Sequence, residues 1–473
     1  MSDHIFPLIN LQVVSMKKIA TVPYIPPEII RMIFGLLRDD KKTLATCALV
    51  SHTFNLHATP FLYHTVAFVF PHTFTLFANV VNDIKKRSHM VRHLDLSGFS
   101  TCGLQKSYSD FHNVVTPELL IYILRSCPEL KTFSVSESLE FVITFDVLKV
   151  LFLECKNVIT IDLCGFSTKQ FGNTLEQFCR LIGRVRIDDC GNDLTTAFNV
   201  NDEPALSHLQ RLSLHECAVI SECSTIILLA NAPNLTHLDL GGCSISDLTI
   251  NFLAETNAPT NFRHLLLAKC KNISSCAISS LILKCSQLES LNLYGVRDTT
   301  TIINEYDLIN ILSSPSAKNL QILDIGSSQI TPLVLTLIKE NCSSSLKNLG
   351  ISKAQITNIS VIKDLLTSLP NLQYIDLTSV LCFNVLNTNT LLNSIVKNNH
   401  PIHTIEMNDS LLKKLYATKG WKIDVNYGRR WYYSRESRLD SIRADRVHGR
   451  KLDLTEYGPE YMSNIFQYYS FDA

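Results

Sequence analysis

From Val91 onward, the apolar residues follow one repeating pattern. An apolar residue is followed by two variable positions, a second apolar residue, one variable position, a third apolar residue, two variable positions, and then Cys or a small residue. The clearest copies are Leu209-Leu212-Leu214-Cys217, Leu235-Leu238-Leu240-Cys243, Phe262-Leu265-Leu267-Cys270 and Leu288-Leu291-Leu293-Val296. Weaker copies start at Val91, Leu130, Val158, Ile182, Leu320, Leu346, Leu372 and Ile402. The pattern predicts about twelve repeats whose starts lie 24 to 39 residues apart.

Each copy predicts a short strand, because its apolar residues alternate with variable ones that face solvent. The segments between copies, such as residues 276–285, have helical spacing of apolar residues. The pattern matches the L-x-x-L-x-L-x-x-C/N signature, and residues from Val91 to about Leu412 resemble the cysteine-containing leucine-rich repeats. We therefore predict an α/β solenoid with parallel strands on its concave face and helices on its convex face.

The 15 cysteines recur at two positions of the repeat, after the strand and just before it. Zinc binding is one interpretation, but successive thiols lie about one repeat apart and no C-x-x-C pair or neighbouring His completes a ligand set. Packing as small buried apolar side chains is favoured, so no metal and no cofactor are predicted. Unpaired, scattered cysteines favour the cytoplasm or nucleus.

A second apolar pattern occupies residues 25–62 and predicts three short helices. Pro26 and Pro27 suit a helix start, Glu28 suits its positive end, and apolar residues follow at helical spacing. So small a unit cannot bury this much apolar surface by itself. The adjoining repeats or another protein must therefore cover part of it.

This stretch resembles the F-box, with its L-P-x-E-I-L-x-x-I-F-x-x-L pattern and a second helix ending V-C-x-x-W. Phe54 stands where the family usually has Trp, and Ser51 where Cys is common. The resemblance implies a small three-helix unit that docks onto a Skp-type adaptor, and through it onto a cullin. The residues that it implies for this contact are Pro26, Glu28, Ile29, Ile33, Phe34, Leu37, Leu44, Val50, Phe54 and Leu62. The alternative is a helical cap that seals the first repeat.

The patterns divide the chain into five segments. We expect an N-terminal extension (1–22), an F-box (23–66), a linker or cap (67–90), the repeats (91–412), and a C-terminal cap and tail (413–473). The last segment combines basic residues with Trp421 and Trp431, and a segment of this composition could bind single-stranded nucleic acid. It also suits a cap on the last repeat, which we favour, so a nucleic-acid partner is not expected.

The central solvent-facing position of the predicted strands is acidic in six of twelve repeats. A concave wall of one charge would favour a basic segment of a protein partner, although Asp is also frequent at this position without any shared ligand. The candidate substrate-binding residues are Asp162, Arg186, Arg211, Asp239, Asn292, Asp324, Asp376 and Glu406. A flanking column of Arg184, Arg211, His237 and His264 could instead receive an acidic or phosphorylated side chain.

No catalytic motif of the P-loop, H-E-x-x-H or G-x-S-x-G kind is present. With 43 basic and 43 acidic residues, no overall charge steers the chain to nucleic acid or membrane, and no apolar run is long enough to span a bilayer. The resemblance implies a non-catalytic substrate-recognition subunit of a ubiquitin ligase whose protein substrate is unknown. A ligase-independent scaffold and a GTPase-activating repeat protein are the alternatives.

Overall fold

The structure is a computed structural model. It describes residues 25–38, 40–68, 71–83, 85–99, 114–183, 203–256, 258–295, 303–398, 400–402, 404–412, 414–415, 421–425 and 431–435. The chain forms two compact units, Met1–Leu62 and Tyr63–Ala473. In the described part of the chain, no helix is long and apolar enough to cross a membrane.

The N-terminal unit is built from three helices, as predicted. They are α1 (Pro27–Leu36), α2 (Lys41–Ala48) and α3 (His52–His64), the last of which runs on past Leu62. Pro27 occupies the first turn of α1, where no backbone N–H is needed, and the Asp40 side chain caps α2 by accepting from the Thr43 amide at 2.9 Å. The helices enclose a core of Ile30, Phe34, Leu44, Ala48 and Ala58.

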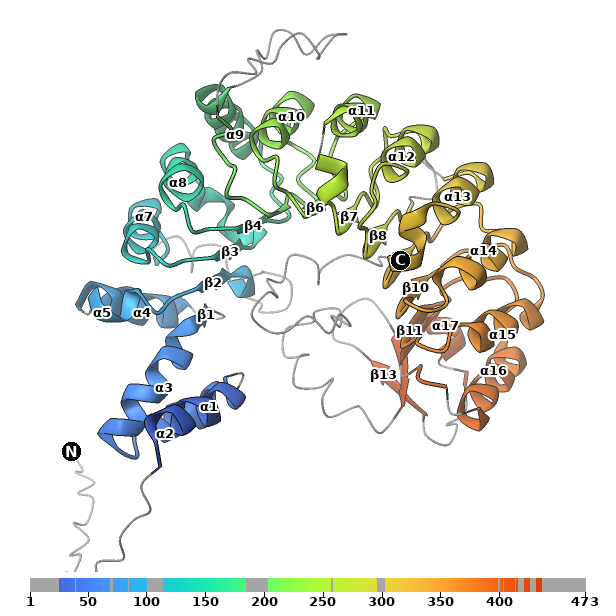
Figure 1. Cartoon of the computed structure of the whole chain (residues 1–473), viewed down its shortest axis with the longest axis horizontal. Coiled ribbons are helices and arrows are strands. Elements are labelled where there is room, and N and C mark those ends of the chain that lie inside the picture. The colour runs from blue at the N-terminus through green and yellow to red at the C-terminus, as the bar shows by residue number, and fades with distance from the viewer. Residues whose placement is uncertain are drawn as a thin grey trace, which may run out of the picture. The chain divides into compact units, whose positions relative to one another are not determined.

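The second unit is a solenoid whose strands form one sheet in chain order (Figure 1). Each of β1 to β11 pairs in parallel with the next strand, up to β12, and the central residues lie opposite one another. The strands are β1 (Thr65–Ala67), β2 (His93–Leu96), β3 (Thr132–Val135), β4 (Thr160–Leu163), β5 (Arg211–Ser213), β6 (His237–Asp239), β7 (His264–Leu266), β8 (Ser290–Asn292), β9 (Ile322–Asp324), β10 (Asn348–Gly350), β11 (Tyr374–Asp376) and β12 (Thr404–Met407). The predicted α/β solenoid with parallel strands is confirmed.

Eleven of the twelve predicted repeat starts lead into a strand, and one is wrong. Ile182 is the last residue of α9 (Lys169–Ile182), and β4 pairs directly with β5, so no strand lies between them in the sheet. Arg184 and Arg186, which the prediction placed on that strand, lie outside the described residues. Conversely, the sequence pattern did not predict β1, which pairs with β2 and extends the sheet at that end.

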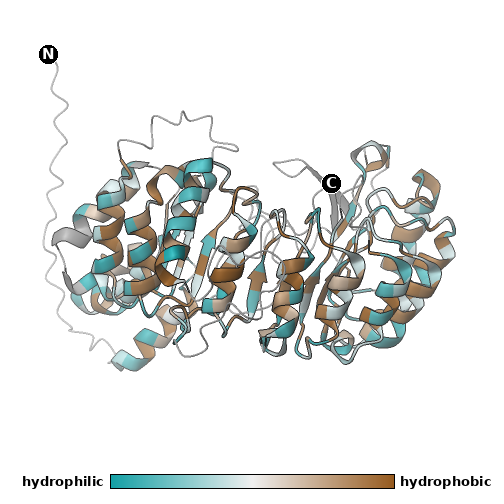
Figure 2. Ribbon diagram, turned by 90° about the horizontal axis from the view of Figure 1, so that it is seen from above, coloured by the Kyte–Doolittle hydropathy of each residue, from teal (hydrophilic) through white to brown (hydrophobic). Residues whose placement is uncertain are grey.

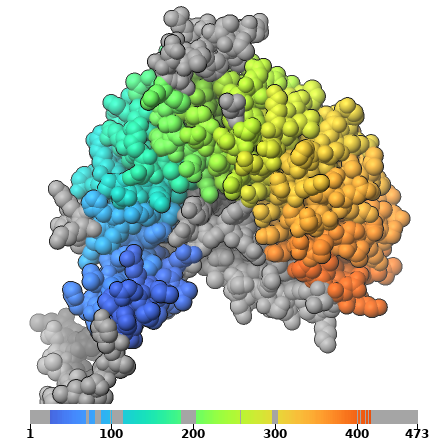
Figure 3. All heavy atoms as spheres, viewed as in Figure 1, coloured from blue at the N-terminus to red at the C-terminus, as the bar shows by residue number. Residues whose placement is uncertain are grey.

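The helices follow the strands on the outer side of the curved sheet (Figure 1), and side chains of successive repeats pack against one another along the surface in the order of the chain (Figure 3). They are α4 (Pro71–Asp83), α5 (Lys85–Ser88), α7 (Pro117–Ser126), α8 (Phe145–Lys149), α9, α10 (Glu222–Asn231), α11 (Asp247–Glu255), α12 (Ser275–Ile282), α13 (Glu305–Leu312), α14 (Pro332–Cys342), α15 (Ile359–Ser368), α16 (Val385–Lys397) and α17 (Asp409–Leu412). The helices combine apolar and polar residues (Figure 2), and their apolar side chains join those of the strands in one continuous core. After β12, the antiparallel strands β14 (Trp431–Arg435) and β13 (Trp421–Val425) end the sheet.

Hydrogen bonds between helix starts connect neighbouring repeats. The Glu222 carboxylate at the start of α10 accepts from the amides and hydroxyls of Ser246 and Thr249, at the start of α11, at 2.8 to 3.1 Å. The same arrangement joins Asp247 to the amide of Ser274 and Glu305 to the hydroxyl of Thr331. Each carboxylate therefore satisfies helix-start donors that belong to the following repeat.

We expect Glu222→Ala to lower the free energy of unfolding by about 1–3 kcal/mol, because two amides and two hydroxyls lose their acceptor. Urea unfolding measures this change. Glu255→Ala, at the other end of the neighbouring helix α11, is the control and should change stability by no more than about 0.5 kcal/mol. Equal effects of the two substitutions would contradict the role given to Glu222.

Candidate functional site

An exposed apolar stripe follows one face of α1. Ile29, Met32, Ile33 and Leu36 recur at helical spacing and are 44%, 67%, 45% and 88% exposed. In the same unit, Leu49, Val50 and Leu56 are also exposed. Apolar side chains this exposed and this close in sequence are typical of a surface that another protein covers.

The predicted adaptor contacts fall into three groups in the structure. Pro26, Glu28, Ile29, Ile33 and Val50 are exposed. Leu37, Phe54 and Leu62 are half-buried and pack against the core of the unit. Phe34 and Leu44 are buried, so their assignment as direct contacts needs correction: they shape the surface from inside. The Phe34 ring meets the Phe54 ring edge-on, with centroids 5.4 Å apart.

Sequence reasoning missed four exposed apolar residues, namely Met32, Leu36, Leu49 and Leu56. Met32 and Leu36 lie three and seven residues after Ile29, so the helical period alone could have placed them on its face. Leu49 lies in the turn after α2 and carries no such periodic signal.

The column of central strand residues on the concave face is buried, which corrects the expectation that these side chains face solvent. Asp162, Asp239, Asn292, Asp324, Asp376 and Glu406 are each at most 3% exposed. Five members of the column, including the half-buried Asp95, accept a hydrogen bond from the backbone amide two residues further on. These pairs are Asp95–Ser97, Asp239–Gly241, Asn292–Tyr294, Asp324–Gly326 and Asp376–Thr378, at 2.8 to 3.0 Å. Their oxygens satisfy the backbone where each strand ends.

One carboxylate of this column forms a buried ion pair. Asp239 Oδ1 lies 3.0 Å from Nδ1 of His215, and both side chains are almost fully buried. Burial by itself would lower the pKa of His215, but the Asp239 carboxylate outweighs it and the pKa is raised. A Cβ atom at position 241 would lie 2.7 Å from the His215 ring, so the glycine there makes room for the pair.

The flanking column contains two histidines in ring contact. The rings of His237 and His264 have centroids 4.0 Å apart. Burial lowers the pKa of both, to about 3 for His264, and the guanidiniums of Arg211 and Arg263 act in the same direction. Both imidazoles are neutral near pH 7, so among the described members of this column Arg211 carries the charge that could receive an acidic group.

Three of the four cysteines expected after the strands are buried, as predicted, and Cys190 lies outside the described residues. Cys217, Cys243 and Cys270 donate to the backbone carbonyls of Leu163, Leu214 and Leu240, which lie at or directly after the strand ends of the preceding repeats, at 2.9 to 3.2 Å. Burial raises the pKa of all three thiols, to about 12 for Cys270. These thiols pack between repeats, and the described residues contain no cluster of potential metal ligands.

Comparison with known proteins identifies the N-terminal unit. Residues 22–102 match the family model described as the COS11 F-box domain. The chain carries an F-box domain. The match extends from before α1, through β1, α4, α5 and β2, to residue 102. The F-box is thus followed in the same chain by the leucine-rich-repeat type of solenoid.

Similar solved structures have low sequence identity. One is the yeast complex of Rad7 and Elc1, with 17% identity over 75% of this chain and 88% of that chain, at a TM-score of 0.43. Another is an internalin from Listeria monocytogenes, with 16% identity over 68% of this chain and 94% of that chain, at a TM-score of 0.30. No curated protein matches the chain significantly.

Proposed function

We propose that this chain is a non-catalytic substrate-recognition subunit of a ubiquitin ligase of the Skp, cullin and F-box type, acting in the cytoplasm or nucleus. The F-box docks onto a Skp-type adaptor, and through it onto the cullin. The solenoid binds a protein substrate. The observation that carries the proposal is the exposed stripe of Ile29, Met32, Ile33 and Leu36 on α1 of an F-box domain.

The exposed apolar area of this stripe supports the proposal that another protein binds over it. Fully burying one large apolar side chain contributes about 1.5–3 kcal/mol, so four that are between 44% and 88% exposed together provide a strong local driving force for binding. Phe34 and Leu44, inside the unit, hold the helices that present the stripe. Glu28 and Pro26 add polar and rigid groups at the exposed N-terminal end of the same helix.

The mechanism is proximity, with no bond made or broken by this chain. One unit holds the ligase and the other holds the substrate, so a lysine of the substrate reaches the ubiquitin-charged enzyme at a raised effective concentration. Specificity then resides in the solenoid, and the F-box determines only which ligase is recruited.

Recovery of a recombinant Skp-type adaptor with the full-length chain tests the proposal. We expect Ile33→Asp combined with Leu36→Asp to lower the adaptor affinity at least tenfold, because two charges replace two of the four apolar contacts of the stripe. Leu333→Asp, at an exposed apolar position on α14, is the matched control and should bind as the unaltered chain does. Both variants should keep the thermal unfolding profile of the unaltered chain, since the substituted side chains are exposed.

Equal adaptor recovery with the double variant, or no recovery with the unaltered chain, would contradict adaptor docking. Either result would favour the ligase-independent scaffold.

A further inference from the structure

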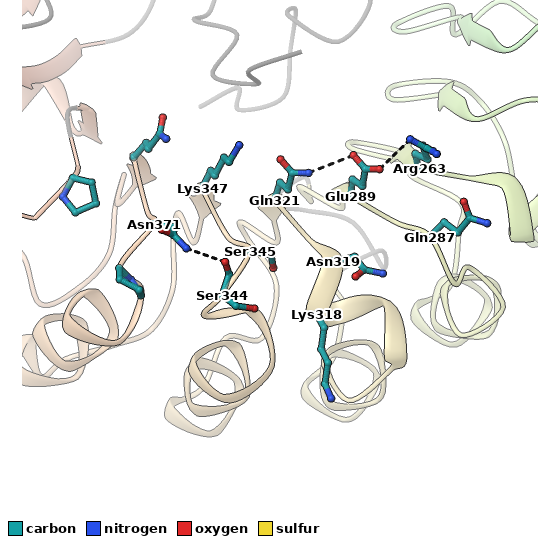
Figure 4. Close-up of a pocket in the computed structure, with 13 residues that line it drawn as sticks. Arg263, Gln287, Glu289, Lys318, Asn319, Gln321, Ser344, Ser345, Lys347 and Asn371 are labelled. Carbon is teal, nitrogen blue, oxygen red and sulfur yellow. Dashed lines mark hydrogen bonds and ion pairs between the residues drawn. The ribbon is translucent and has the colours of Figure 1, made fainter. Parts of the chain in front are cut away.

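A polar groove of about 750 Å³ lies along the loops that lead into strands β7 to β12 (Figure 4). Its lining comes from repeated positions, mainly one, three and four residues before each strand. We call the residues immediately before the strands the entry row. In the groove the entry row consists of Arg263, Glu289, Gln321, Lys347 and Gln373.

Backbone hydrogen bonds hold the entry row in register. The amide of each entry residue donates to the carbonyl of the entry residue in the preceding repeat, from Glu289 to Arg263 through to Gln373 to Lys347, at 2.7 to 2.8 Å. On the outer side of the groove, the Asn371 side chain donates to the Ser344 carbonyl at 2.8 Å. The spacing of the side chains along the groove is therefore determined by the sheet.

The groove presents more positive than negative charge. Its lining contains Arg263, Lys318 and Lys347 but one carboxylate, Glu289. That carboxylate lies 3.4 Å from Nη1 of Arg263 and accepts from Gln321 Nε2 at 3.4 Å, as Figure 4 shows. Because Glu289 and Arg263 offset one another, Lys318 and Lys347 leave the lining with a net charge of plus two, so an anionic partner is favoured over a cationic one.

Amide side chains make up much of the remaining lining, including Gln287 and Gln373. An amide both donates and accepts, so it can pair with the N–H and C=O groups of an extended polypeptide. Five neighbouring strand starts span roughly 19 Å at about 4.8 Å each, which an extended segment of about six residues covers. The groove suits a main chain that runs across the repeats.

At its β12 end, the groove adjoins a second, more apolar pocket. This pocket, of about 410 Å³, shares Pro370 and Pro401 with the groove and is lined by Leu366, Leu391 and Ile395 of α15 and α16. The volume accommodates one large aliphatic side chain. The polar groove favours charged and polar groups along the ligand, and the apolar pocket beside it favours an apolar side chain at one end of the ligand.

We propose that this groove binds an extended acidic segment of a partner protein, with one terminal aliphatic side chain in the pocket between α15 and α16. Carboxylates of the segment pair with Arg263 and Lys347, and its main chain pairs with the entry-row amides. The proposal concerns peptide binding by the solenoid, so it stands whether or not the F-box docks an adaptor.

Fluorescence anisotropy with the full-length chain and a labelled peptide of sequence Leu-Gly-Glu-Gly-Glu-Gly-Glu-Leu tests this proposal. We expect binding at low ionic strength that weakens as salt is added and is at least tenfold tighter than for the same peptide with Gln in place of Glu. Arg263→Gln combined with Lys347→Gln should weaken binding at least tenfold. Lys131→Gln, in the corresponding position before β3 and outside the groove, is the matched control and should bind like the unaltered chain.

A further variant tests the apolar anchor. Ser394 lines this pocket, so Ser394→Phe adds a ring that reduces its volume and should weaken binding of the Leu-ended peptide, but not of a peptide with Ser at both ends. The proposal is overturned if the acidic peptide does not bind, if the double variant binds it as tightly as the unaltered chain, or if oligothymidylate of similar charge binds equally well.

Discussion

Asp162→Asn is expected to stabilise the solenoid at pH 8 and to remove the loss of stability that ionisation of Asp162 causes between about pH 4 and pH 7. Burial raises the pKa of Asp162 from its ordinary value of 3.8 to about 7, with a further contribution from the nearby Asp239 carboxylate. One of its oxygens, Oδ1, is buried without a hydrogen-bond partner. The charged form of this side chain is therefore costly in the folded state.

The direction in which stability changes with pH follows from the number of protons that the folded and unfolded chains bind. Because the pKa is higher in the folded state, the folded chain keeps a proton that the unfolded chain releases above about pH 4. The contribution of Asp162 to stability is thus greatest below its unfolded pKa and falls as the pH rises to about 7. A shift of about three units corresponds to roughly 4 kcal/mol. Asn does not ionise and avoids this loss.

Urea unfolding at pH 4.5, 6 and 8 measures the effect. The unaltered chain should lose stability over this range relative to Asp162→Asn, and the two curves should diverge as the pH rises. Asp146→Asn, at an exposed position on α8, is the matched control and should follow the unaltered chain. A destabilised Asp162→Asn variant at pH 8 would show that the carboxylate is charged and well accommodated.

Phe34→Ala is expected to unfold the F-box helices while the solenoid remains folded. Phe34 is 2% exposed in a core of five buried residues, and truncating a buried Phe costs about 3–5 kcal/mol. A unit with so small a core has little stability to lose. Backbone hydrogen exchange should show loss of protection in α1, α2 and α3, with the amides of β5 to β11 unchanged.

Leu36→Ala is the control for this experiment, because Leu36 lies two residues away on the same helix and is 88% exposed. It should leave hydrogen exchange in the unit unchanged. Persistent protection in the Phe34 variant would mean that the three helices are held by something other than this core. The comparison also distinguishes two causes of lost adaptor binding. Phe34→Ala would weaken binding by unfolding the F-box helices, whereas Leu36→Ala would weaken it by removing a surface contact.

The strands could be predicted because alternate residues of each strand are buried in the core and must therefore be apolar, which leaves a repeating pattern in the sequence. The pattern gave a wrong prediction at Ile182, because this residue belongs to helix α9. Phe171, Leu175, Phe178 and Ile182 lie at helical spacing and are buried along one face of α9. A motif that begins at the last residue of such a helix imitates a repeat start. The strand β1 carries too few apolar residues, in Thr65–Ala67, to show any pattern.

The environment of the central column could not be predicted from alternation alone. Periodicity indicates which side of the strand a residue occupies, but not whether its oxygens are already engaged. A local signal was present, because Asp95, Asp239, Asp324 and Asp376 are each followed two residues later by Ser, Gly or Thr. Asp before a small residue at this spacing favours a turn in which the carboxylate accepts a backbone amide. The groove beside β7 to β12 carries no motif, since its residues come from six separate repeats.

The carboxylates that join successive helix starts also determine how the solenoid comes apart. Glu222, Asp247 and Glu305 each belong to one repeat and accept from donors of the next, so a repeat that unfolds leaves its neighbour with an amide or hydroxyl that has lost its acceptor. Such nearest-neighbour coupling penalises a boundary between folded and unfolded repeats at these positions. We therefore expect fraying to begin at the ends of the array and the coupled middle repeats to open together.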